Sequence, residues 1–85
     1  MGRISAPTPH IGQLLLGHEQ RGRSDVLYYL VLGKDGNMTI WTYVSSDHAA
    51  EWERPPIYFS EFDQIRVGGV PAKQLIAEKL NSISN

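Results

Sequence analysis

The chain has no cysteine among its 85 residues. This absence excludes disulfide bonds, thiolate metal ligands and a cysteine nucleophile, and it suits a protein of a reducing compartment. No apolar run approaches the roughly 18 residues that a membrane-spanning helix needs, and residues 1–10 have no apolar core of signal-peptide length. We therefore expect a cytoplasmic protein that does not contact a membrane.

Charge of one sign is not in excess, because the formal net charge is −1 at pH 7. A chain this close to neutrality lacks the positive potential that attracts nucleic acids. The charge is nevertheless uneven, because the stretch between residues 47 and 63 holds a single base, Arg54, against the acids Asp47, Glu51, Glu53, Glu61 and Asp63. The middle of the chain is therefore expected to be acidic.

Motifs for catalysis or metal binding are also missing. There is no Gly-x-Ser-x-Gly sequence, and the run from Ser45 to His48 is more typical of a helix cap than of a nucleophilic site. His48 and Glu51 offer fewer ligands than a stable metal site needs. Gly68-Gly69 is followed by Pro71, which removes a backbone amide and favours a tight turn over a phosphate-binding loop. We expect no enzyme activity, no metal and no cofactor.

A β-hairpin is the clearest structural prediction. Val26–Leu32 is apolar or aromatic throughout, Met38–Val44 alternates, and the glycine-rich Gly33–Asn37 lies between them. A two-residue turn at Asp35-Gly36 would leave neither face of the hairpin cleanly apolar. A three-residue loop, Lys34–Gly36, separates the side chains better. It places Val26, Tyr28, Leu30, Leu32, Met38, Ile40 and Val44 on one face and Leu27, Tyr29, Val31, Trp41 and Tyr43 on the other.

The second face is too apolar to lie free in solvent, so we expect another element, a second copy of the chain or a partner to cover it.

The other predicted elements complete an α+β domain. They are a strand at Ile11–Gly17 beside the hairpin, a polar loop at His18–Asp25, a short helix at Asp47–Glu53, a strand ending at Gln64–Val67 and a helix at Val70–Ile83. The last helix has an apolar stripe of Ala72, Leu75, Ile76, Leu80 and Ile83. The predicted fold is a small antiparallel sheet of three to four strands, with a short middle helix and the C-terminal amphipathic helix packed on one face. Residues 1–10 are expected to be an irregular arm and residues 11–85 a single domain.

The middle segment combines acids with aromatic side chains, which is typical of protein interfaces. The first functional hypothesis is a non-catalytic protein-binding domain that occupies a basic surface of a larger partner. An inhibitor, immunity or anti-defence protein, encoded by a phage or mobile element, would fit this size and lack of catalytic motifs. The predicted partner-binding residues are Glu51, Trp52, Glu53, Tyr58, Glu61, Phe62 and Asp63. The same aromatic side chains would instead belong to the core if only the acids face solvent.

Two alternatives remain open. A nucleic-acid-binding module would use the sheet aromatics as a stacking platform with nearby bases, and its residues would be Arg21, Arg23, Tyr29, Trp41 and Tyr43, with Lys34 and Arg66. A structural homodimer would bury the second face or the edge of the hairpin between two copies.

Overall fold

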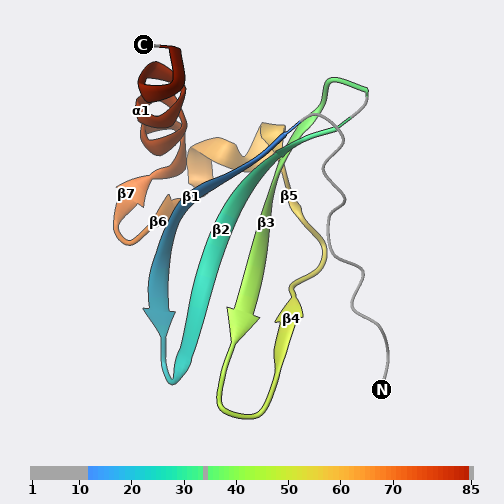
Figure 1. The fold of residues 1–85 in the computed structure, drawn as a ribbon, viewed down its shortest axis with the longest axis vertical. Helices are drawn as coiled ribbons and strands as arrows, with labels where there is room; N and C mark the ends of the chain where they lie inside the picture. Colours follow the sequence, from blue (N-terminus) through green and yellow to red (C-terminus); the bar gives the residue numbers. More distant parts are fainter. Residues whose placement is uncertain (1–11, 34, 85) are drawn as a thin grey trace.

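A computed structural model describes residues 12–33 and 35–84 of the chain. Its elements are β1 (Gly12–Arg21), β2 (Ser24–Leu32), β3 (Met38–Ser45), β4 (Ala50–Trp52), β5 (Ile57–Tyr58), the 3-10 helix η1 (Phe59–Gln64), β6 (Arg66–Val67), β7 (Val70–Pro71) and α1 (Ala72–Ser84). The strands β1, β2, β3 and β4 are neighbours in one antiparallel sheet (Figure 1), in which β5 also pairs with β3, and β6 pairs with β7. The predicted α+β architecture, with an antiparallel sheet and a C-terminal helix, is confirmed. The arm predicted at residues 1–10 lies outside the described residues.

The β2–β3 hairpin has the register of the three-residue loop. Leu32 pairs with Met38 and Leu30 with Ile40. The Gly33 N–H donates to the Asn37 carbonyl over 2.9 Å, and Gly36 has a φ of +84°. A left-handed residue closes this type of loop, and glycine adopts that conformation without steric cost.

The β1–β2 hairpin differs from the prediction at its polar end. A strand beside β2 is confirmed, but the expected loop at His18–Asp25 is wrong, because β1 continues to Arg21 and β2 begins at Ser24. A bulge between Leu15 and Gly17 shifts the register within β1. The polar residues belong to β1 and β2 because the side chains of Glu19 and Arg21 form hydrogen bonds with other parts of the fold, as described below.

The helix predicted at Asp47–Glu53 is also wrong. The Ser46 N–H donates to the Ala49 carbonyl over 2.7 Å, and the His48 N–H donates to the Ser46 hydroxyl over 3.3 Å. This turn leads into β4, where Trp52 pairs with Tyr43 of β3. A serine side chain stabilises a helix cap and a turn by the same hydrogen bond to a nearby amide. Here the pairing of β4 with β3 selects the turn instead of the helix. The helical turn of the middle segment comes later, as η1.

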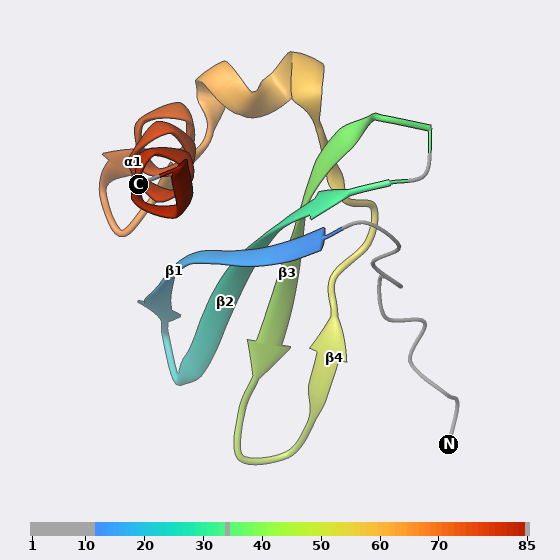
Figure 2. The same cartoon turned by 45° about the horizontal axis from the view of Figure 1, so that its top comes forward.

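The core lies on one side of the sheet, which we call the core face (Val26, Tyr28, Leu30, Ile40 and Thr42). Figure 2 shows η1 and α1 on the same side of the sheet. Their apolar side chains, together with one from β6, complete the buried cluster with Phe62, Val67, Ala72 and Ile76.

The C-terminal helix begins at Ala72 instead of Val70, because Val70 and Pro71 pair with β6. It packs mainly against β1, β7 and η1. The apolar stripe is buried at Ala72 and Ile76, but Leu80 is 47% exposed, and Figure 1 shows the end of α1 projecting away from the sheet. The side chain of Ile83 lies outside the described part. Of the stripe residues whose side chains are described, those of the first turns therefore contact the core.

Phe62 should contribute more to stability than any exposed aromatic residue of η1. Its ring is only 1% exposed and packs at 5.3 Å from the ring of Phe59, which is itself 56% exposed. Replacing Phe62 by alanine leaves a cavity in the core, so we expect the free energy of unfolding to fall by about 3–5 kcal/mol. Urea unfolding followed by circular dichroism measures this change.

Phe59→Ala is the matched control, since it removes the same side chain from the surface. We expect it to cost less than about 1.5 kcal/mol, the contribution of one aromatic pair. Equal losses in the two variants would contradict the assignment of Phe62 to the core.

Candidate functional site

The side of the sheet opposite the core face is apolar and aromatic. We call it the aromatic face, and it consists of Leu15, Leu27, Tyr29, Val31, Trp41, Tyr43 and Trp52. Leu15 lies opposite Tyr29, which lies opposite Trp41. This alignment follows from the hairpin register, because residues paired across antiparallel strands point to the same face. Within residues 12–33 and 35–84, both η1 and α1 lie on the other side of the sheet, so no described helix covers this face.

Trp52 is the centre of the aromatic face. Its ring lies 4.9 Å from the ring of Tyr43, 5.5 Å from that of Tyr29 and 6.3 Å from that of Trp41, in tilted or edge-to-face arrangements. The guanidinium carbon of Arg54 lies 6.0 Å from the centroid of the Trp41 ring, within the range of a cation–π contact. All four rings are partly buried. The rings therefore pack on one another and are still partly accessible.

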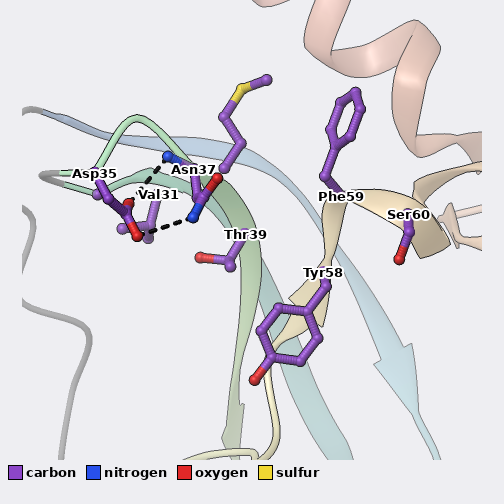
Figure 3. Close-up of a pocket in the computed structure, with 9 residues that line it drawn as sticks. Val31, Asp35, Asn37, Thr39, Tyr58, Phe59 and Ser60 are labelled. Atoms are coloured by element: carbon purple, nitrogen blue, oxygen red, sulfur yellow. Dashed lines mark hydrogen bonds between the residues drawn. The ribbon is translucent and has the colours of Figure 1, made fainter.

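A first hollow, of about 430 Å³, lies at the edge of the aromatic face, between the β2–β3 loop and the start of η1. Val31, Met38 and Thr39 line it from the sheet, Asp35 and Asn37 from the loop, and Tyr58, Phe59 and Ser60 from β5 and η1 (Figure 3). The Asp35 carboxylate accepts hydrogen bonds from the Asn37 N–H at 3.0 Å and from the Asn37 side-chain amide at 2.8 Å. The backbone hydrogen bond from Asn37 lowers the pKa of Asp35, with a further contribution from the Asn37 side chain. The loop carboxylate is thus engaged within its own loop.

A second hollow, of about 480 Å³, lies at the opposite end of the same face. It is lined by His18 of β1, Asp25 and Leu27 of β2, and Tyr43 and Ser45 of β3. Leu27 lies opposite both His18 and Tyr43, and Asp25 lies opposite Ser45. The aromatic cluster thus lies between the two hollows.

A polar cluster occupies the core face near the end of β1. The Tyr28 hydroxyl donates to Glu19 over 2.8 Å, and the Gly68 N–H donates to the other oxygen of Glu19 over 2.9 Å. Arg21 donates to Glu53 over 3.0 Å and to the Tyr28 hydroxyl over 3.4 Å. These bonds join β1, β2 and the end of β4 to the β6–β7 turn.

The cluster changes the pKa values of its members. The hydrogen bond from the Gly68 N–H, followed by that from Tyr28, lowers the pKa of Glu19. Burial raises the pKa of Tyr28, and its hydrogen bond to Glu19 acts in the same direction. The hydrogen bond between Arg21 and Tyr28 raises the pKa of Arg21. Both Glu19 and Arg21 therefore stay charged. We call this cluster of Glu19, Arg21, Tyr28, Glu53 and Gly68 the clamp, because its hydrogen bonds hold separate parts of the fold together.

The predicted partner-binding residues do not gather on one surface. Alternation along β4 puts Trp52 on the aromatic face, while Glu53 binds Arg21 and Thr42 on the core face. Glu51 is exposed beside Val44 on the core-face side, and Tyr58 is exposed at the first hollow.

The remaining members of that set lie in η1. The Glu61 carboxylate accepts the Tyr58 N–H at the start of η1, over 3.3 Å. Asp63 forms an ion pair with Lys73 of α1 at 2.8 Å. The Phe62 ring is buried and has no surface to offer a partner.

The residues predicted for nucleic-acid binding are divided as well. Tyr29, Trp41 and Tyr43 lie together on the aromatic face, as the register predicted. Arg21 points to the opposite face, and Arg23 lies in the exposed β1–β2 turn. Arg66 donates to the Gly69 carbonyl at 3.0 Å in the β6–β7 turn.

Sequence reasoning missed Leu15, His18, Asp25 and Ser45 as parts of the face. The signal for Asp25 and Ser45 is side-chain alternation one pair beyond the predicted hairpin, and that for Leu15 and His18 is their pairing with Tyr29 and Leu27 across the β1–β2 hairpin.

Comparisons of the chain with protein-family models, with curated proteins and with solved structures gave no match. Within residues 12–33 and 35–84, no group of three or more His, Asp or Glu side chains is placed to hold a metal ion. No helix in this part of the chain is long and apolar enough to cross a membrane.

Glu19 should make stability depend on pH below its ordinary pKa of 4.5. Because folding lowers this pKa, the stabilisation is present above the unfolded value and is lost as the pH falls through the folded value. We expect Glu19→Gln to reduce the free energy of unfolding at neutral pH by about 1–2 kcal/mol, the range for a hydrogen bond to a charged group near the surface. The difference from the wild type should shrink towards zero in acid. Urea unfolding at a series of pH values measures it.

Glu51→Gln is the control, since it changes an exposed glutamate on the same side of the sheet. Its effect should be small at every pH. A Glu19→Gln effect that stays constant from neutral pH into acid would show that the charge of Glu19 is not what the clamp uses.

Proposed function

We propose that the chain is a non-catalytic protein-binding domain and that the aromatic face is its contact surface. The observation that carries this proposal is the partly exposed cluster of Tyr29, Trp41, Tyr43 and Trp52 on a sheet face without a helical layer. Tyrosine and tryptophan are enriched at the energetic centres of protein interfaces, where large rigid rings bury much surface at low entropic cost.

The hollows support a protein partner over a flat stacked ligand. Each has the volume that receives one or a few side chains, about 430 Å³ at Tyr58 and about 480 Å³ at Asp25. An aromatic cluster between two hollows offers the shape complementarity that specific interfaces require. A partner with protruding side chains at both ends would engage the whole face.

The partner we propose is a larger protein with a basic surface. Asp25 lies on the aromatic face and Asp47 in the neighbouring β3–β4 turn, and both are exposed. Exposed acids around an aromatic contact favour basic partners and repel phosphate groups. Covering a basic surface is how an inhibitor, immunity or anti-defence protein would act, and we extend the proposal to that class because the chain is small and has no recognisable catalytic motif.

A nucleic-acid-binding role is less well supported. A base that stacks on Trp41 would compete with Arg54, which lies over that ring. Arg21 cannot assist, since it is bound to Glu53 on the opposite face. A homodimer through the aromatic face is the main competing arrangement and is separated from the proposal by the mass of the protein in solution.

The test introduces a charge into the aromatic face. Leu15 is 45% exposed and lies beside Tyr29, so Leu15→Glu should leave the fold intact and repel an apolar contact. We expect Leu15→Glu to weaken binding to a captured partner at least about 10-fold, the loss of about 1.4 kcal/mol. Binding is followed by the emission of Trp41 and Trp52, since both tryptophans of the chain lie on this face. Capture from a lysate of the cells that produce the protein supplies the partner.

Leu80→Glu is the matched control, because Leu80 is 47% exposed but lies on α1, on the other side of the sheet. It should bind the partner as the wild type does. Binding that is lost in Leu80→Glu and retained in Leu15→Glu would move the contact surface to the helix. A stable dimer that captures no protein, and that Leu15→Glu converts to a monomer, would replace the proposal by self-association.

A further inference from the structure

The second hollow has the chemistry of a site for a cationic side chain. We infer that it receives an arginine or lysine side chain of the protein partner, with the Asp25 carboxylate as the acceptor. This inference rests on the proposed function and adds to it the kind of residue that the partner must present.

The hollow has an apolar part and a polar part, which suit the methylene stem and the charged head of such a side chain. Leu27 and Tyr43 lie opposite each other and supply apolar surface for a methylene stem. Asp25 and Ser45, the next pair on the same face, supply oxygen acceptors beyond them. Arginine and lysine combine an apolar stem with a head that only donates hydrogen bonds. The apolar pair is followed along the face by the polar pair, as the methylene stem of arginine or lysine is followed by its charged head.

Asp25 differs from most carboxylates in the described part of the chain, which are already bound by the chain itself. The bound carboxylates are those of Glu19, Asp35, Glu53, Glu61, Asp63 and Glu78. Within residues 12–33 and 35–84, no hydrogen bond or ion pair involves the carboxylates of Asp25, Asp47 or Glu51. Of these three, Asp25 is the one that lines a hollow on the aromatic face. Its charge is therefore available at the proposed contact surface.

The two hollows of the face would then select different side chains. In the first hollow the acid is Asp35, and Asn37 already occupies both of its oxygens. Its exposed rings, Tyr58 and Phe59, suit an apolar side chain. The second hollow combines the Asp25 carboxylate, which no described residue of the chain binds, with the Tyr43 ring, to which a guanidinium or ammonium group is attracted as well. The partner should therefore present an apolar residue and a basic residue at opposite ends of its contact.

The experiment uses N-acetyl-arginine amide as the probe, added to the full chain and followed by two-dimensional NMR of the backbone amides. The citrulline derivative is the control ligand, because it keeps the shape of arginine without the charge. We expect arginine, and not citrulline, to shift the amides of Leu27, Tyr43 and Ser45, and added salt to reduce the shifts. Asp25→Asn should weaken arginine binding by about 3–10-fold, the range between exposed and partly desolvated charge pairs.

Asp47→Asn is the matched variant, since it removes another unpartnered aspartate that does not line the hollow. It should bind arginine as the wild type does. Equal shifts with citrulline, unchanged binding in Asp25→Asn, or an equal loss in Asp47→Asn would each overturn the inference.

The captured partner separates this inference from the proposed function. If Leu15→Glu loses the partner and Asp25→Asn binds it as tightly as the wild type, the basic side chain is refuted and the contact surface stands. If both variants retain the partner, the proposed contact surface is refuted as well. Loss of the partner in both variants supports both statements.

Discussion

The pairing of Leu32 with Met38 determines which side chains this domain buries. The pair is fixed by a loop that closes between Gly33 and Asn37 with Gly36 in the left-handed conformation. Because side chains alternate along a strand, this register sends Leu30 and Ile40 to the core, and it sends their neighbours, among them Tyr29 and Trp41, to the opposite face. A slip of one residue on β2 would turn Tyr29 towards the core and expose Leu30, and a slip on β3 would do the same to Trp41 and Ile40. Both the core and the proposed binding surface therefore depend on the geometry of one short loop.

The core face contains hydroxyl groups that must be satisfied once η1 and α1 cover it. Tyr28 and Thr42 are both buried, and an unsatisfied buried polar group is costly. Glu19 accepts the Tyr28 hydroxyl, and Glu53 accepts that of Thr42. Arg21 balances Glu53, and Glu19 also binds the β6–β7 turn through Gly68. Several charged side chains of the acidic and basic stretches are thus engaged in contacts within the chain, so fewer carboxylates remain for a partner.

The sequence predicted the parts of the fold that local patterns decide. The hairpin follows from two β-rich runs around a Lys-Asp-Gly loop, and the C-terminal helix follows from its apolar spacing. The polar ends of β1 and β2 could not be recognised, because Glu19 is satisfied by Gly68, which lies 49 residues away. The turn after β3 was mistaken for a helix start because Ser46 caps either structure with the same bond. Three of the aromatic residues of the candidate site follow from the predicted register, and Asp25 lies one pair beyond it, opposite Ser45. Trp52 joins the site through the pairing of β4 with β3, in a segment for which the sequence predicts a helix.

The aromatic face persists because one helix and one 3-10 turn cannot cover both sides of this sheet. Phe62, Ala72 and Ile76 are all used on the core face, and α1 then projects away from it. An antiparallel sheet that faces water normally carries polar residues on that side, yet here the strands present Tyr29, Trp41 and Tyr43. Trp52 shields part of each ring, and Arg54 lies over Trp41, so the face avoids the fully exposed apolar surface that leads to aggregation. Under the proposed function, this partly shielded cluster is the contact surface. The Asp25 carboxylate, to which no residue within 12–33 or 35–84 is hydrogen-bonded or ion-paired, would then favour a partner with a basic side chain at that end of the face.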